Sequence, residues 1–432
     1  VAGNLGYQQL RHFKTEEALA TLNQEAQFAV RSGGLDVNQP DIASGYVFNE
    51  GWRIEALGTL NKGEEALRAA VAAGAVTDRL IDRWPSNLQA LKAKQLIASN
   101  VGFGAMDAMR DVEALDFGRR GVEASASLAR IDPGNRVVAF NLAVDHDLVA
   151  DAAWQTGRPR QSTDELRLAL DVFTRSTVVE PKSVFYVFYL IYTQATRLAE
   201  IGDGSGAAVM LARAAPLVQR VRAREPAGSP LRALAECWAE GSKADVALID
   251  ADAAMARRVL ERDCVTPLRT LNPSDTDQQH YRDEALFDST YSVAEAAFLQ
   301  RDYVAAEAAA RESLAARARF PMRTNAGRRE QADTATVLSM SLARQGKLGE
   351  ASAVIAPVVK LHRALRLRNQ DDQWQRVQLA AALYAQALTD KAKRAPLLAE
   401  AKALIASLPA QMRPLRTIQL WRERITAAGH EP

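Results

Sequence analysis

Few side chains in this sequence stand in a pattern that could support chemistry. The strongest candidate for a metal site is the acidic cluster Asp145-His146-Asp147 with Asp151. Asp147 and Asp151 would lie one turn apart on a helix and could share a cation, but adjacent residues on a helix point in different directions. A hydrated polar helix face is therefore the expected role. The remaining histidines are scattered, without the one-turn pairing that zinc hydrolases use, so no metal is expected.

Other catalytic patterns are weak or incomplete. Gly202 to Gly206 is the one glycine-dense segment, but no Lys-Ser/Thr pair follows it as in a phosphate-binding loop, and an inter-helix turn explains it. Asp371 and Asp372 resemble the start of a magnesium-binding acidic motif but lack its third acid. Cys237 and Cys264 have no histidine partner in sequence; we expect two buried small side chains, with one disulfide left open. The sequence therefore predicts no catalytic residue, no metal and no cofactor.

The composition excludes several classes of protein. The chain has 432 residues, 48% hydrophobic and 25% charged, and a formal net charge of +2. Near-neutrality removes the electrostatic case for a nucleic-acid binder. The longest uncharged stretch, Ser183 to Thr196, is far shorter than the roughly 20 residues of a membrane span. Length alone suggests about three domains.

Prolines divide the chain at a nearly fixed interval of 45 to 48 residues. Ser, Asn or Gly commonly follows these prolines, as in Asp132-Pro133-Gly134-Asn135 and Trp84-Pro85-Ser86-Asn87. Proline cannot continue a helix, and a following Ser or Asn can cap the next one; Ser86 with Gln89 reads as a capping box. The marks are Pro40, Pro85, Pro133, Pro181, Pro226, Pro273 and Pro321, with Pro409 about two intervals later.

Each interval reads as two antiparallel helices with one polar or glycine-bearing turn between them. Such turns occur at Gly157-Arg158-Pro159, Gly202-Asp203-Gly204 and Arg301-Asp302. No strand pattern occurs, so we expect an all-α protein. The helical period is clear in one apolar stripe with steps of three and four. Its members are Ala114, Phe117, Gly121, Ala124, Leu128 and Ile131.

Small residues recur twelve positions apart across the predicted hairpins, as in Ala195 with Ala207, Ala294 with Ala306, and Ser339 with Ala351. This spacing resembles tetratricopeptide repeats, most specifically in the segment from Tyr291 to Leu314. The resemblance implies an α-solenoid, a superhelix of antiparallel hairpins with a concave binding groove. The units are longer than the usual ~34 residues and fall near HEAT and armadillo lengths, which we consider the alternative. They also resemble repeat regions of bacterial multidomain signalling proteins.

The resemblance implies a single array over residues 1–432, of about nine hairpins. We expect the first unit to be completed upstream of Val1, and a capping helix at 413–428. The chain begins without Met or a targeting segment, so we expect a cytoplasmic or periplasmic fragment of a longer protein. The predicted units are 1–40, 41–85, 86–133, 134–181, 182–226, 227–273, 274–321, 322–368 and 369–409.

Two surfaces are candidate binding sites. In the tetratricopeptide register the first helix of each hairpin lines the groove, and exposed tyrosines there would be rigid anchors; packing between units is the alternative role. A basic patch near the end of the chain could hold an acidic peptide or phosphate, although arginines also favour helix ends for their dipole. The groove candidates are Tyr189, Tyr192, Thr196, Tyr291, Glu295 and Phe298, and the basic candidates are Arg323, Arg328, Arg329, Arg363, Arg366 and Arg368.

The sequence thus predicts a non-catalytic scaffold that binds a protein or peptide partner along a concave groove. The first alternative is the sensor or scaffolding arm of a larger bacterial signalling protein, with a kinase, cyclase or transcription-regulator domain upstream of Val1. The second is an all-helical α/α-toroid enzyme. That enzyme would require paired carboxylates and an aromatic pocket, which the steady repeat and the 6% aromatic content disfavour.

Overall fold

The computed structural model describes residues 2–12, 14–60, 62–175, 181–226, 228–273, 276–320 and 325–429. Within these ranges the chain is helical throughout and contains no strand. Consecutive helices pair as antiparallel hairpins, which confirms the all-α, tetratricopeptide-like class expected from the sequence. None of the helices in the described ranges combines the length and hydrophobicity that a membrane span requires. The predicted limits of individual repeat units stay a prediction.

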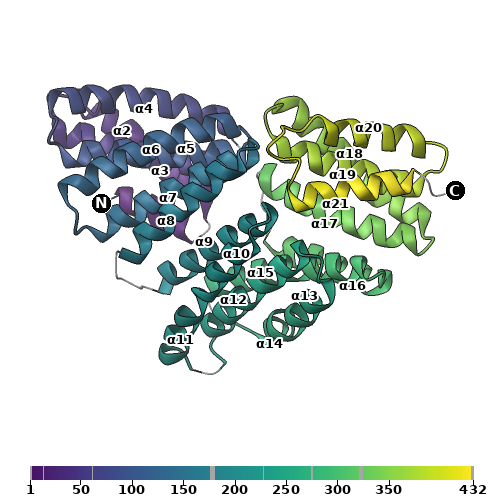
Figure 1. The fold of residues 1–432 in the computed structure, drawn as a ribbon. Helices are drawn as coiled ribbons and strands as arrows, with labels where there is room; N and C mark the ends of the chain where they lie inside the picture. The colour runs from purple at the N-terminus through teal and green to yellow at the C-terminus, as the bar shows by residue number, and fades with distance from the viewer. Residues whose placement is uncertain are drawn as a thin grey trace. The chain divides into compact units, whose positions relative to one another are not determined.

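Contacts between Cα atoms group the chain into two units. Unit 1 comprises Val1–Thr156, Asp164–Val178 and Arg323–Gly327, and unit 2 comprises Gly157–Thr163, Val179–Met322 and Arg328–Pro432. In unit 1, α3 to α7 run side by side, each packed on the next (Figure 1). Its helices are α1 (Ala2–Arg11), α2 (Thr15–Arg31), α3 (Pro40–Thr59), α4 (Gly63–Arg83), α5 (Leu88–Asp107), α6 (Asp111–Ile131), α7 (Arg136–Gln155) and most of α8 (Pro159–Arg175).

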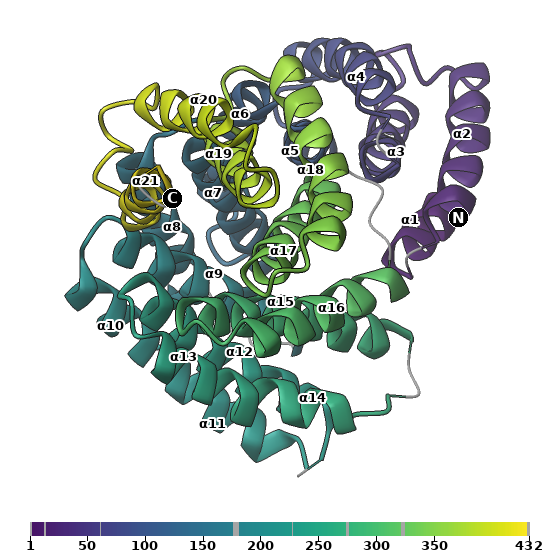
Figure 2. The same cartoon turned by 90° about the vertical axis from the view of Figure 1, so that its right-hand side faces the viewer.

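Unit 2 continues the hairpin pattern, with α12 beside α13 and α15 beside α16 (Figure 2). Its π-helix η1 follows α13 directly and packs on α12. The helices are α9 (Pro181–Glu200), α10 (Gly204–Ala212), α11 (Ala214–Arg224), α12 (Pro230–Ile249), α13 (Ala253–Val259), η1 (Leu260–Val265), α14 (Thr266–Thr270), α15 (Thr276–Leu299), α16 (Tyr303–Arg319), most of α17 (Asn325–Arg344), α18 (Leu348–Arg368), α19 (Gln373–Thr389), α20 (Arg394–Ala406) and α21 (Arg416–Ala428).

Six of the hairpin turns share one backbone feature. Each of the six has a residue with positive φ two positions before the first residue of the second helix, a conformation that ends many helices. Glycine adopts it without strain, but several of these positions carry side chains. The turn recurs at intervals of 45 to 50 residues, so the repeat is present in the backbone itself. The residues are Met109, Gly157, Gly202, Ala251, Arg301 and Gly346.

Exchanging alanine and glycine at two of these turns should shift stability in opposite directions. Ala251 has φ 65°, and Gly202 has φ 87° with no atom within 4 Å of an added Cβ. Ala251→Gly should therefore raise the free energy of unfolding by about 0.5–1 kcal/mol, and Gly202→Ala should lower it by a similar amount. Urea denaturation measures both. Equal destabilisation by both changes would contradict the shared turn.

The small residues noted in the sequence lie where paired helices approach each other. Ala294 on α15 and Ala306 on α16 are both fully buried. The Ser339 hydroxyl on α17 donates to the Ala351 carbonyl on α18 at 2.9 Å. A larger side chain at these positions would separate the helices, since protein interiors are close-packed. The tetratricopeptide-like spacing therefore corresponds to helix pairing.

Helix starts follow the proline marks with small differences. Asn87 caps α5 by accepting from the backbone of Gln89 and Ala90, so the predicted Ser86 capping box is wrong by one residue. Ser229 is the N-cap of α12 with Pro230 next, as expected, although its side chain makes no capping hydrogen bond. In the apolar stripe of α6, Ile131 is 54% exposed because it ends the helix.

The acidic cluster of α7 is buried, which corrects the expectation of a hydrated helix face. Asp145 is 0% exposed and lies between α5, α6 and α7 in unit 1. Its carboxylate accepts hydrogen bonds from the hydroxyls of Ser99 and Ser125 and from the Gln95 amide at 3.3 Å. Burial raises the pKa of Asp145 to about 6, and these donors limit the rise. Asp145 therefore serves a buried polar network.

This network makes the stability of unit 1 depend on pH. Because the pKa of Asp145 is raised in the folded state, folding loses stability as pH rises from about 4 to about 6. Asp145→Asn removes the ionisation. The free energy of unfolding of the variant, relative to that of the wild type, should therefore rise by roughly 2–3 kcal/mol between pH 4 and pH 7. Urea midpoints of both proteins across this range provide the measurement. A constant difference would show that Asp145 ionises without penalty.

Cys237 and Cys264 are buried, as expected, and are joined by a disulfide. The bond connects α12 to η1 across a Cα–Cα distance of 4.5 Å, within the range that disulfides require. The disulfide left open by the sequence is therefore formed in the structure.

Candidate functional site

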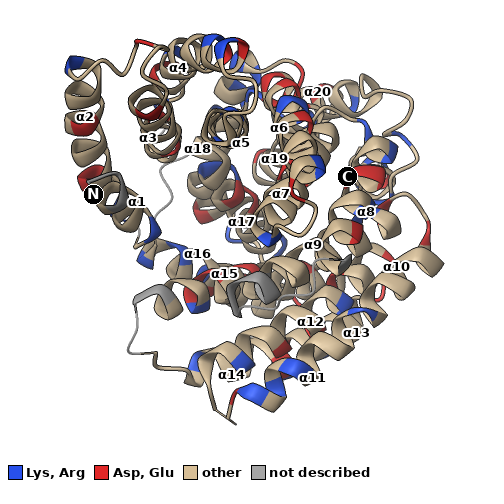
Figure 3. Cartoon of the chain, turned by 90° about the vertical axis from the view of Figure 1, so that its left-hand side faces the viewer, with Lys and Arg blue, Asp and Glu red and all other residues tan. Residues whose placement is uncertain are grey.

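Acidic side chains from three helices of unit 2 face one another. We call them the acidic lining. Their charges influence one another's pKa values, so these side chains lie near one another. Figure 3 marks acidic residues on α15 and α17 in red. The acidic lining comprises Asp245 on α12, Glu284, Asp288 and Glu295 on α15, and Glu330 and Asp333 on α17.

The spacing on α15 explains why these residues face the same way. Glu284, Asp288, Tyr291 and Glu295 follow steps of four, three and four, which place side chains on one stripe of a helix. The opposite side of α15 carries buried apolar residues such as Val293 and Ala297. The apolar side of α15 thus packs into the protein, and the acidic stripe lies on the other side of the helix.

Two tyrosines lie within the acidic lining and hydrogen-bond to it. The Tyr192 hydroxyl on α9 donates to Asp245, which also accepts from Ser292. The Tyr291 hydroxyl donates to Glu295 one turn further along α15. Each tyrosine retains partial solvent exposure. Both tyrosines therefore lie beside carboxylates of the lining.

Desolvation, with neighbouring carboxylates as a smaller cause, raises the pKa values of these acids. Desolvation by the surrounding helices, reinforced by the charge of Glu295, raises the pKa of Asp245 to about 7. Desolvation also raises the pKa of Asp333 to about 8, although Arg329 opposes the rise. The pKa of Asp288 is raised by desolvation and then by Glu284 and Glu330, but its side chain is exposed and water screens part of this effect. Glu330 is paired with Arg317 and Asp333 is influenced by Arg329, whereas no cation contributes to the pKa shift of Asp245.

A further cation reaches the lining from α21. The Arg424 guanidinium lies 5.7 Å from the centre of the Phe298 ring and 4.9 Å from that of Trp421. Its charge opposes the desolvation that raises the pKa of Glu295. The start of α21 is fixed on α9, where the Thr417 backbone donates to the Glu200 carboxylate at 3.0 Å. The lining therefore accommodates a guanidinium stacked on aromatic rings.

Three of the six predicted groove residues belong to this region. Tyr192 and Tyr291 hydrogen-bond to its carboxylates, and Glu295 is one of them. The other members of the acidic lining were not predicted from the sequence: Asp245, Glu284, Asp288, Glu330 and Asp333. The four-three-four spacing on α15 could have identified Asp288, whereas Asp245 and Asp333 lie on other helices and required the packing.

The other three predicted groove residues make local contacts. Tyr189 stacks with Tyr186 at 6.0 Å between ring centroids. The Thr196 hydroxyl donates to the Tyr192 carbonyl at 3.0 Å. Phe298 is 9% exposed and packs on Tyr303 at 5.4 Å. Their groove role stays a prediction.

The predicted basic patch stays a prediction, and its members make different contacts. Arg363 and Arg366 on α18 line a pocket with Arg376 of α19. Arg329 pairs with the buried Asp372 at 3.0 Å. The other members are Arg328 and Arg368, which are exposed, and Arg323, which lies outside the described residues.

No group of three or more His, Cys, Asp or Glu side chains in the described ranges is arranged to hold a metal ion. Asp371 and Asp372, singled out in the sequence, precede α19, and Asp372 caps that helix by accepting from the Gln375 backbone at 2.8 Å. The pair therefore serves a helix start.

Comparisons with known proteins give distant structural matches. No protein-family model matches the chain, and no curated protein matches it. The chain is similar to a Rap protein complexed with competence and sporulation factor, at 12% identity over 86% of this chain and 96% of that chain, with a TM-score of 0.46. It is also similar to the P58(IPK) TPR domain, at 12% identity over 99% and 98% and a TM-score of 0.21. Yeast Tom70 matches at 13% identity over 86% and 89%, with a TM-score of 0.23. Similarities at this level carry no argument about function.

Proposed function

We propose that this chain is a binding scaffold whose unit 2 captures a cationic segment of a protein or peptide on the acidic lining. The observation that carries the proposal is the proximity of Asp245, Glu295 and Asp333, which come from three different helices and influence one another's charge. Structural acids are normally paired, because an isolated buried charge costs free energy. A ligand with Arg or Lys side chains would supply the missing positive charge.

The position of Arg424 supports a guanidinium as the preferred group. Arg424 stacks on Phe298 and Trp421 and lies beside Glu295, so one end of the lining has its cation. Asp245 and Asp288 have only hydroxyl groups or other carboxylates as their main neighbours, apart from the opposing charge of Arg317 near Asp288. A ligand arginine would repeat at these residues the arrangement that Arg424 makes at Glu295.

Tyrosines fit the same role. Tyr192 and Tyr291 have few rotatable bonds and combine an apolar ring with a polar tip, so they lose little entropy on binding. Arginine also stacks on aromatic faces. The scaffold needs no catalysis of its own for this role. It would serve equally as a free adaptor or as the sensing arm of a larger signalling protein.

A peptide titration tests the proposal. Fluorescein-labelled hexa-arginine is added to the full chain at pH 8.5, where Asp245 and Asp333 are largely ionised, and fluorescence anisotropy is recorded. We expect saturable binding of one peptide per chain, and none for labelled hexa-glutamate. Equal binding of the two peptides, or no binding of either, would overturn the proposal.

A further inference from the structure

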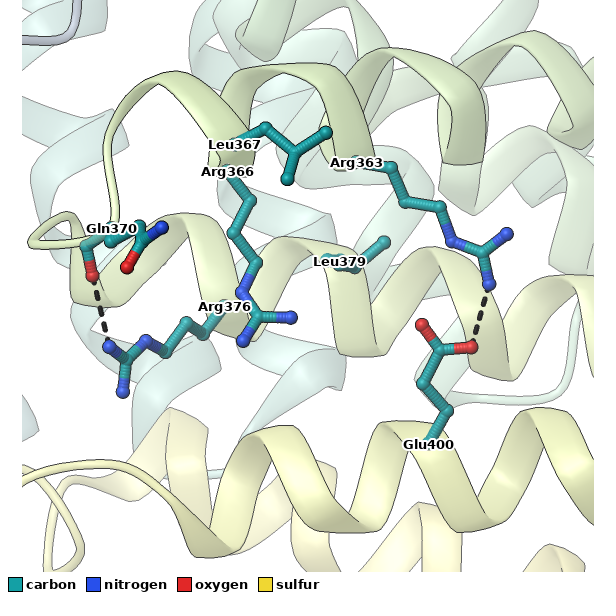
Figure 4. Close-up of a pocket in the computed structure, with 7 residues that line it drawn as sticks. All are labelled: Arg363, Arg366, Leu367, Gln370, Arg376, Leu379 and Glu400. Atoms are coloured by element: carbon teal, nitrogen blue, oxygen red, sulfur yellow. Dashed lines mark hydrogen bonds and ion pairs between the residues drawn. The ribbon is translucent and has the colours of Figure 1, made fainter.

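A second site lies apart from the acidic lining, in a pocket of about 410 Å³ between α18, α19 and α20. This volume is within the range of small-molecule sites. Figure 4 shows the side chains that line it. They are Arg363, Arg366, Leu367, Gln370, Arg376, Leu379 and Glu400.

The pocket carries an excess of positive charge. Three arginines line it against one acid, Glu400, which leaves two positive charges. Arg363 binds Glu400 at 2.6 Å. Arg376 is held in place by backbone carbonyls, because its Nη2 donates to Gln370 at 2.9 Å and its Nη1 to Ser407 at 3.3 Å. These bonds to neutral carbonyls orient the Arg376 charge without neutralising it.

Hydrogen-bond donors in the pocket remain unused. The buried Nε of Arg376 has no partner. Arg366 is half-buried, and no hydrogen bond or ion pair involves its guanidinium in the described part of the chain. In Figure 4 its side chain extends from α18 among the lining residues, and no interaction is drawn to it. An arginine fork left open in this way matches the oxygens of a phosphate or carboxylate.

Apolar surface adjoins these donors. Leu379 is 1% exposed and lines the pocket from α19, whereas Leu367 is 79% exposed on α18. A ligand that pairs with the arginines would thus also contact leucine side chains. This combination favours an anion that carries an apolar remainder over a bare anion.

We propose that this pocket binds a small phosphomonoester, with its phosphate on Arg366 and Arg376 and its organic part against Leu367 and Leu379. A phosphate monoester carries about −1.5 to −2 charge at neutral pH, which balances the two excess positive charges of the pocket. Arg363 and Glu400 form one wall and already satisfy each other. A monocarboxylate would leave one positive charge unmatched.

Isothermal titration of the full chain with phenyl phosphate tests this site. Phenyl phosphate should bind saturably, and at least about fivefold more tightly than inorganic phosphate, because only the former contacts the leucines. Phenol, which lacks the phosphate, should not bind. Equal affinity for phenyl phosphate and inorganic phosphate would overturn the proposed organic contact, and no saturable binding of phenyl phosphate would overturn the site.

Matched arginine variants locate the binding. Arg366→Gln should weaken phenyl phosphate binding by at least about tenfold, because a charged hydrogen bond is lost. Arg368→Gln makes the same charge change on the exposed side chain two residues along α18, outside the pocket, and should leave affinity unchanged. Circular dichroism confirms that both variants are folded. Equal losses in the two variants would show a diffuse charge effect and overturn the assignment.

Discussion

Replacing Asp245 and Asp333 together by Asn should weaken binding of hexa-arginine by about 100-fold at pH 8.5. Each carboxylate would make a charged hydrogen bond with a ligand guanidinium, worth about 1.5–3 kcal/mol, and the amides keep the shape of the side chains. Both residues are partly exposed, so we use the lower end of that range for each. The anisotropy titration described above provides the measurement.

The control variant changes the same charge elsewhere. Asp82→Asn with Glu123→Gln removes two exposed acids of unit 1, whose side chains make no ion pair in the described structure. If these acids acted only by long-range attraction, both double variants would bind the peptide equally weakly. Salt screens such attraction at distances beyond about 10 Å. A loss limited to Asp245 and Asp333 therefore indicates a site. Equal losses of affinity in the two double variants would show that the peptide responds to overall charge and would contradict a site at the acidic lining.

The same residues give the binding a pH dependence. With pKa values of about 7 for Asp245 and about 8 for Asp333, both are mostly protonated at pH 6 and ionised at pH 9. A cation prefers the ionised forms, so affinity should rise from pH 6 to pH 9 and protons should be released on binding. In the double Asn variant this rise should be much smaller.

The second large effect concerns the disulfide between Cys237 and Cys264. Replacing both by Ala should lower the free energy of unfolding of unit 2 by about 3–4 kcal/mol, because the 27-residue separation defines the loop whose closure restricts the unfolded chain. Urea denaturation under oxidising conditions measures the loss. With reductant present, wild type and variant should differ only by the small packing change.

Thiol labelling provides an independent check of that bond. Alkylation in denaturant without reductant should modify neither cysteine, and prior reduction should expose both. Two alkylated thiols in the unreduced protein would contradict the disulfide. The stability loss would then have to come from packing alone.

Local signals in the sequence were enough to predict the helical hairpins. Pro230 and Asn135 identify helix starts because ring geometry and side-chain capping act over a few residues. Turns at Ala251 and Arg301 carry no glycine, so their positive φ is imposed by the paired helices and was not visible in the sequence. Polar and glycine-bearing segments nevertheless identified the turns at Gly157, Gly202 and Arg301.

The candidate site was predicted only in part. Tyr192, Tyr291 and Glu295 were predicted because the tetratricopeptide register places them on the groove side of two first helices. Asp245 and Asp333 look like ordinary helical acids in sequence, and only packing brings them together. Asp145 was expected to be hydrated because the residues beside it in the sequence are polar. This expectation was wrong, because three helices bury its side chain.

Photo-cross-linking tests the central claim most directly. Hexa-arginine carrying a benzophenone at one end is bound to the full chain at pH 8.5, irradiated, and the labelled residues are identified by mass spectrometry. The acidic lining predicts cross-links concentrated in α9, α12, α15 and α17 around Tyr192, Asp245 and Tyr291, and their loss in the Asp245→Asn, Asp333→Asn double variant. Cross-links spread over both units, or confined to unit 1, would contradict the proposed site.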